Sequence, residues 1–344
     1  MKNLYHFIDE ILSCATLTLE NEPIGYSREE RPIYGYSVGK GKIKISLIAG
    51  CHADEPVGPM FLRKLVNFLD SLPDKHPLLT SYTWCIVPHG NPDGEAKNKK
   101  WYSDEDTHIN LVDYLTLSRR EAPGEDVEFG FPIKGMYDAL RVENKVIFDF
   151  WLKQNISFRL HASLHGMAKS YGPWFLLDRN WIKKSEPLQQ ECVARCHELG
   201  YAVLHDVDRR GEKGFTRIAK GFCTRPDSSA MRKHFLLQED VKMASLFRPS
   251  SMESVRSFSG NTLTLVSEMP LFILPQTNDT LSWPNPELED WSETFLKWKL
   301  SALHDPRNKK TIQDQAIKLG VKAMPIADQM KLQWQLIVAG IKLL

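Results

Sequence analysis

The sequence predicts an α/β fold with a mixed, largely parallel central sheet, helices on both faces and a helical C-terminal extension. Three observations support this prediction. Short β-rich segments alternate along the chain with segments of helical periodicity. Polar residues that can bind metal follow several of the expected strands. The chain has 344 residues, 42% of them hydrophobic and 25% charged, which is enough for a large buried core.

The first expected unit is a strand, a loop and a helix. Ile43, Ile45 and Leu47 alternate with polar or small residues and lead into Ile48-Ala49, a pattern that indicates a buried strand. Residues 50–55 follow as a loop. Beyond Pro56, apolar residues recur at helical spacing as far as Leu72, and proline is well suited to the first helical turn, where its missing N–H costs nothing.

The middle of the chain continues the alternation. A turn is expected at Asn91-Pro92-Asp93-Gly94, and residues 97–134 lack periodicity, which indicates a long ordered loop of the functional kind. The remaining expected elements are strands at 82–87 and 157–164 and helices at 136–152 and 188–199. Residues 205–255 are polar and give no clear assignment.

The C-terminal part is expected to contain one strand and then helices. Alternating Thr and apolar residues predict a strand that ends at Ser267-Glu268. From Lys309 onward the pattern is helical, and Pro325 divides it into two helices. We therefore expect a main domain over residues 1–300 and a helical extension over 301–344 that packs on it.

Composition excludes several kinds of partner. The chain carries 44 Lys and Arg against 43 Asp and Glu, and this balance argues against a nucleic acid or an anionic membrane as partner. The first twelve residues include Asp9 and Glu10, which a signal peptide would not, and no run of eighteen apolar residues is present. Six cysteines without C-x-x-C spacing favour a reducing compartment, so we expect a cytoplasmic protein.

Four polar residues stand out because they lie near expected strand ends, where ligands gather in open α/β sheets. His52 and Glu55 lie three positions apart in the loop after the first strand, His165 follows the strand at 157–164, and Glu268 ends the last strand. Two imidazoles and one carboxylate form a three-ligand zinc set that leaves a fourth position open, and a further carboxylate nearby would act as general base. His161 lies on the same strand face as His165 but roughly 13 Å away, so we expect a core or supporting role for it.

These motifs resemble those of the M14 zinc carboxypeptidases. His52-Ala53-Asp54-Glu55, Asn91-Pro92-Asp93-Gly94, Ser163-Leu164-His165-Gly166 and Thr264-Leu265-Val266-Ser267-Glu268 occur in the order used by that family. The resemblance covers roughly residues 40–275. It implies one Zn²⁺ per chain held by His52, Glu55 and His165, with Glu268 as general base.

The same resemblance implies roles for residues that depart from the family pattern. Lys100 falls where members often carry an Arg that polarises the scissile carbonyl, and Asn98 and Asn110 are expected to contact substrate. Leu111 stands where members use an Arg to bind the terminal carboxylate of the substrate. Possible replacements for that Arg lie in the 205–255 region: Arg209, Arg210, Arg217 and Arg225.

We therefore expect a zinc metallopeptidase that cleaves an amide bond of a peptide or modified peptide at or near its C-terminus. Leu111 indicates weak action on simple free C-termini and a preference for a more specialised peptide. Two alternatives stay open: a zinc-dependent deacylase of N-acyl amino acids, of the succinylglutamate desuccinylase or aspartoacylase type, and a peptide-binding protein that needs zinc but does not catalyse. Glu268 argues against the latter, because binding alone requires no base. The oligomeric state is left open.

Overall fold

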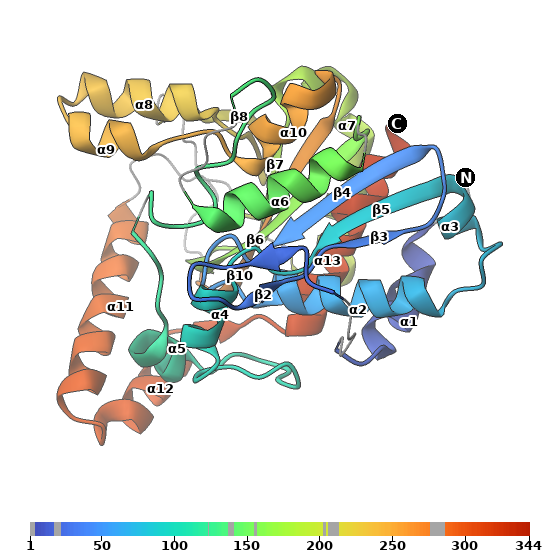
Figure 1. The fold of residues 1–344 in the computed structure, drawn as a ribbon. Coiled ribbons are helices and arrows are strands. Elements are labelled where there is room, and N and C mark those ends of the chain that lie inside the picture. Colours follow the sequence, from blue (N-terminus) through green and yellow to red (C-terminus); the bar gives the residue numbers. More distant parts are fainter. Residues whose placement is uncertain are drawn as a thin grey trace.

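The computed structural model describes residues 4–16, 22–122, 124–136, 141–154, 157–201, 204–205, 213–275 and 286–344. It confirms the predicted α/β class: helices cover both faces of a mixed nine-stranded sheet within these residues (Figure 1). The strand order is β3-β5-β4-β6-β10-β7-β9-β8, and β11 also pairs with β10. A separate hairpin joins β1 (Gly25–Tyr26) and β2 (Pro32–Ile33).

The centre of the sheet is parallel. Its four strands are β5 (Tyr82–Val87), β4 (Ile43–Ala49), β6 (Leu160–Ser170) and β10 (Leu263–Ile273), and each runs parallel to the next. These strands are buried over most of their length, as expected where helices cover both faces.

The outer strands are mixed in direction. β3 (Tyr36–Val38) pairs antiparallel with β5, and β7 (Trp174–Leu177) pairs antiparallel with β10. β9 (Phe222–Thr224) continues parallel to β7, β8 (Thr216–Ala219) is antiparallel to β9, and the short β11 (Lys322–Ala323) is antiparallel to β10.

Two helical layers enclose the sheet. The larger core lies on the face covered by α1 (Ile8–Ser13), α2 (Val57–Ser71), α7 (Glu186–Glu198) and α13 (Ile326–Lys342). On the other face, α6 (Val142–Lys153) and α10 (Ser251–Ser259) share a second core with β4 and β5, and α10 contacts β6; this core includes Ile48, Val87, Ile147, Trp151 and Val255. The remaining helices are η1 (Leu4–Phe7), α3 (Pro77–Ser81), α4 (Pro92–Asn98), α5 (Leu111–Leu117), η2 (Arg179–Lys184), α8 (Ser228–Leu237), α9 (Val241–Leu246), α11 (Pro286–His304) and α12 (Asn308–Lys318).

The predicted loop over 97–134 differs most from the structure. The Asn91-Pro92-Asp93-Gly94 segment begins α4, because Asn91 caps that helix and its side chain accepts a hydrogen bond from the Gly94 amide. A second short helix, α5, lies inside the expected loop and is capped by Asn110. Both helices are only seven residues long, too short to give a clear periodicity.

The strands at the site are longer than predicted. β6 and β10 run on to Ser170 and Ile273, so His165 and Glu268 lie within strands and not at their ends. The predicted helix at 136–152 begins at Val142, and residues 137–140 lie outside the described residues.

The C-terminal helices follow the prediction in part. α12 and α13 lie on either side of Pro325, and β11 precedes that proline. α13 is buried along most of its length and packs on the sheet and on α2. α11 continues through residue 300, and the domain boundary expected there stays a prediction.

Candidate metal centre

The first two candidate ligands are positioned by a tight turn between β4 and α2. Gly50 begins this turn with φ +65°, and a Cβ at that position would lie 2.5 Å from the His89 ring, so the turn requires glycine. At Gly58, in the first turn of α2, a Cβ would lie 2.7 Å from the Leu164 carbonyl oxygen. The absence of a side chain there lets α2 approach β6 closely, which brings Glu55 next to His165.

The three predicted ligands converge, with one donor atom from each within 4.8 Å of the others. His52 Nδ1 lies 2.7 Å from Glu55 Oε1, and His165 Nδ1 lies 2.9 Å from Glu55 Oε2. The two imidazole Nδ1 atoms are 3.1 Å apart. Among the described residues, this trio forms the cluster of His, Cys, Asp and Glu that is suited to a metal ion.

The donor set fits zinc. Ligand atoms at the usual zinc distances of about 2.0–2.1 Å in a tetrahedral site are separated by roughly 3.3 Å, close to the spacing of the two Nδ1 atoms. A divalent cation satisfies all three groups at once.

The sheet register places the predicted base beside a ligand. Glu268 on β10 pairs with His165 on β6 across two parallel strands. Glu268 also lines a cavity of about 400 Å³ that includes His52 and Glu55, together with Arg120 and Arg225. Two of the three predicted ligands and the predicted base therefore line one cavity, and His165 lies beside the base on the neighbouring strand.

The environment of Glu268 favours proton transfer near neutral pH. Burial raises the pKa of Glu268 to about 7, and the Glu55 carboxylate adds to this rise, whereas His165, His52 and Arg120 oppose it. A carboxylate with a pKa near the working pH is suited to accept and then return a proton.

A second carboxylate, that of Glu128, contacts the Nε2 atom of His165. Glu128 is 1% exposed, and its Oε2 atom lies 3.1 Å from His165 Nε2, on the side of the ring away from Glu55. The Ser163 hydroxyl lies 2.8 Å from the same nitrogen. Arg225 forms an ion pair with the other oxygen of Glu128. Such a partner fixes the ring orientation of a metal-binding histidine.

Arg120 brings a positive charge to the rim of the site. Its Nη1 atom donates to Asp54 Oδ1 at 2.9 Å and to Glu55 Oε1 at 3.1 Å. Asp54 is buried, which raises its pKa, and it also accepts a hydrogen bond from the Tyr114 hydroxyl. The guanidinium is nearly half exposed and faces the cavity, where it can meet a substrate oxygen.

Three predicted site residues do not line this cavity. Lys100 is exposed on the turn after α4, and Asn110 is exposed as the cap of α5. Asn98 is buried and holds the backbone of Arg119: its Nδ2 donates to the Arg119 oxygen and its Oδ1 accepts from the Arg119 amide, both at 2.8 Å. The substrate and electrophile roles of these residues stay predictions. Asn98 instead positions the segment that carries Arg120.

The other expectations are met in part. Leu111 is buried and apolar, as its residue type implies. Arg225 lines the cavity, whereas Arg209 and Arg210 lie outside the described residues and Arg217 lies on β8. His161 is fully buried and bonds the hydroxyls of Ser46 and Ser251, which confirms the supporting role expected for it.

Sequence reasoning missed Arg120 and Glu128. Both lie in the aperiodic segment 97–134, and no spacing rule ties them to the ligands. The available signals were the length of the segment and its Arg119-Arg120 pair.

Comparison with known proteins agrees with this geometry. The model of the zinc carboxypeptidase family, peptidase M14, matches residues 4–175, half of the chain. The chain belongs to the zinc carboxypeptidase family. The family is zinc-dependent, so the chain is a metallocarboxypeptidase-like hydrolase whose His52, Glu55 and His165 could bind the metal.

Individual relatives are distant. Zinc carboxypeptidase A 1 of Drosophila melanogaster is 36% identical over 69 residues, a stretch that covers 18% of this chain and only 16% of the fly protein. The metallo-carboxypeptidase of Pseudomonas aeruginosa is 15% identical with a TM-score of 0.41, covering 87% of this chain and 68% of that one. Bovine thrombin-activatable fibrinolysis inhibitor is 16% identical with a TM-score of 0.43, covering 76% and 83%.

Proposed function

We propose that this zinc carboxypeptidase family member hydrolyses an amide bond of a peptide or modified peptide at or near its C-terminus, with Glu268 as general base. The observation that carries this proposal is the cluster of the His52, Glu55 and His165 donors next to Glu268, which pairs with His165 across the sheet and lines one cavity with His52 and Glu55. His52 Nδ1, His165 Nδ1 and the Glu55 carboxylate would hold one zinc ion. When bound, zinc acts as a Lewis acid that polarises the scissile carbonyl and activates water.

The protein's own groups account for the proton transfers. The Glu268 carboxylate accepts a proton from the attacking water and then donates it to the leaving amine. Its raised pKa supports both steps, because the group can be unprotonated before attack and protonated after it.

Arg120 is the group best placed to bind the oxygen that becomes negative during attack. It lines the cavity, whereas Lys100 does not, and its ion pairs with Asp54 and Glu55 fix its guanidinium in advance. Asn98 supports it through the Arg119 backbone.

The substrate is proposed to be more specialised than a simple peptide with a free C-terminus. Leu111 offers no charge, and the charge of each cavity arginine is already balanced: Arg120 by Asp54 and Glu55, and Arg225 by Glu128. A substrate carboxylate would therefore share each guanidinium with buried acids and gain less than from an unpaired arginine. Isopeptides and other modified peptides are therefore the first candidates.

A reducing location such as the cytoplasm is part of the proposal. All six cysteines are unpaired, and five of them are buried. Among the described residues, no helix is both long and apolar enough to cross a membrane.

The test compares Glu268→Gln with the wild-type protein on a substrate panel. The variant should keep its zinc and its fold, because the amide is nearly isosteric, and should lose at least about 10²-fold in kcat/KM. The panel contains blocked dipeptides, isopeptides and N-acyl amino acids. Activity within tenfold of wild type would move the base elsewhere, turnover of N-acyl amino acids alone would indicate the deacylase, and peptide binding without turnover would indicate a binding protein.

A further inference from the structure

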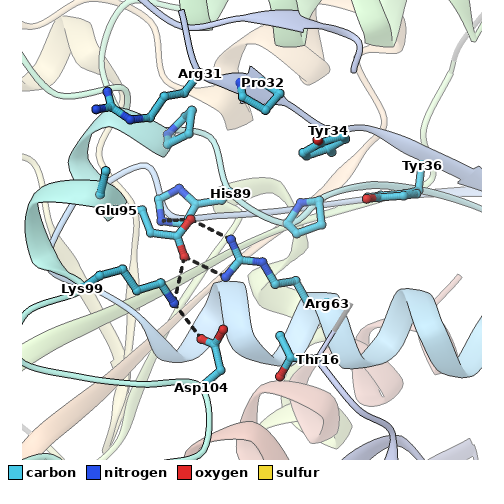
Figure 2. Close-up of a pocket in the computed structure, with 13 residues that line it drawn as sticks. Thr16, Arg31, Pro32, Tyr34, Tyr36, Arg63, His89, Glu95, Lys99 and Asp104 are labelled. Atoms are coloured by element: carbon cyan, nitrogen blue, oxygen red, sulfur yellow. Dashed lines mark hydrogen bonds and ion pairs between the residues drawn. The ribbon is translucent and has the colours of Figure 1, made fainter. Parts of the chain in front are cut away.

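A second cavity of about 620 Å³ lies beside α4 and shares none of its described lining residues with the metal centre (Figure 2). It is formed where β2 and the residues after it meet α2, the end of β5 and α4. Its volume lies within the usual range for small-molecule sites. The metal centre does not use this cavity.

One wall of the cavity is a fixed ionic network. Arg63 on α2 donates twice to the Glu95 carboxylate at 2.7 Å, in a bidentate pair. Lys99 lies 2.9 Å from Asp104 and 3.4 Å from Glu95 (Figure 2). Each acid that lines the cavity is thus already paired with a cation of the protein.

His89 extends this wall as a neutral ring. Burial lowers the pKa of His89 to about 4, so the imidazole is uncharged at neutral pH. The Nδ1 atom of His89 accepts a hydrogen bond from the Asn91 backbone amide, so the ring proton of the neutral imidazole is on Nε2. This Nε2 atom lies 3.9 Å from Glu95 Oε2. His89 therefore adds a donor and no charge.

The opposite wall is apolar but carries hydroxyls. Pro32, Tyr34 and Tyr36 line it with their rings (Figure 2), and Pro88 also belongs to the cavity lining. Tyr36 is only 5% exposed and belongs to the cavity lining, where its hydroxyl can donate a hydrogen bond to a bound ligand.

Donors therefore outnumber free acceptors. Arg31, at the rim, uses Nη1 for both Glu29 and Asp93, so its other guanidinium nitrogens are available. A ligand amine would compete with Arg63 and Lys99 for acids that they already hold. A carboxylate would instead bring acceptors to the Arg31 and tyrosine donors, and a flat apolar body would pack on the rings of Pro32, Tyr34 and Pro88.

We propose that this cavity binds a small organic carboxylate with a flat apolar body, at a site separate from the metal centre. The proposal does not depend on the catalytic function. It rests on the lining residues, on the guanidinium nitrogens that Arg31 does not use within the protein, and on the pairing of the cavity acids with protein cations.

The experiment titrates the full-length, zinc-loaded protein with 3-phenylpropanoate and with its uncharged amide, 3-phenylpropanamide, by calorimetry. The acid should bind about tenfold tighter or better, because a hydrogen bond to a charged acceptor is roughly twice as strong as one to a neutral acceptor. Ala96 is exposed and lines the cavity, so Ala96→Trp should fill it and abolish binding. Tyr36→Phe removes only the hydroxyl and should weaken binding of the acid several-fold.

A control separates this site from zinc, which also attracts carboxylates. His165→Ala should leave binding of the acid unchanged, because the cavity contains no metal ligand. Loss of binding in His165→Ala, equal binding of acid and amide, no binding of either probe, or full binding in Ala96→Trp would each overturn the proposal. If Ala96→Trp does not fold, Tyr36→Phe decides, and unchanged affinity in that variant would also overturn it.

Discussion

Glu128 offers the sharpest test of how the protein prepares its metal centre. The Glu128→Gln substitution keeps the size of the side chain but removes the charge that faces His165 Nε2 at 3.1 Å. It also leaves Arg225 beside a neutral amide in a buried position. His165 then loses its orienting partner, and its Nδ1 becomes a weaker metal ligand.

Loss of such a supporting carboxylate typically costs about 10–100-fold in metal affinity, which corresponds to roughly 1.4–2.7 kcal/mol. We expect a value toward the upper end, because Glu128 is fully buried and charged in the native state. Ser163 still contacts Nε2, so complete loss of zinc is not expected.

The assay measures zinc affinity by competition with a chromophoric chelator, independently of activity. Glu125→Gln is the matched control, since it makes the same chemical change three positions earlier on the same segment. A zinc affinity of Glu128→Gln within two- to threefold of wild type would show that Glu128 does not position His165.

Three further outcomes are expected. His165→Ala should reduce bound zinc from about one per chain to a small fraction, because two ligands hold zinc poorly; elemental analysis that finds unchanged zinc would remove His165 from the ligand set. The value of kcat/KM should fall as the pH falls through the pKa of Glu268, because only the unprotonated carboxylate accepts a proton. Bound zinc adds positive charge and lowers this pKa, so the fall should be centred below about pH 7. A fall in kcat/KM centred above pH 7 would contradict the assignment. Gly58→Ala should lower the free energy of unfolding by about 1–3 kcal/mol, because its Cβ would lie 2.7 Å from the Leu164 carbonyl oxygen. Denaturant unfolding measures this change, with Gly90→Ala as the control, since the nearest contact of its Cβ would be 3.5 Å. Equal stability of the two variants would refute the close approach.

The sequence was informative where the chemistry is local. Alternation from Ile43 to Ala49 predicted β4 to the residue, and helical spacing predicted α2 to within one residue. The His52, Glu55 and His165 trio followed from spacing and from the order of motifs, and the structure brings these residues together.

Non-local pairing was beyond the sequence. Glu128 meets His165 across 37 positions of chain and Arg120 meets Glu55 across 65, and no periodicity records either pairing. Lys100 was chosen by counting positions after Asn91-Pro92-Asp93-Gly94, and a count of positions does not record which way the turn after α4 points its side chains. Beyond His165 and Glu268, β6 and β10 pair with each other and β11 pairs with the end of β10, and the strand pattern does not reveal these pairings.

The pairing of His165 with Glu268 on adjacent strands has a consequence for how this protein could diversify. The spacing between a metal ligand and the base is set by the ladder of hydrogen bonds between β6 and β10, and not by any loop. Insertions or deletions in the surrounding loops can therefore reshape the entrance and select new substrates without disturbing that spacing. A one-residue insertion within either strand would instead turn one of the two side chains to the opposite face of the sheet. An engineer seeking a new specificity should vary the loops and leave these two strands untouched.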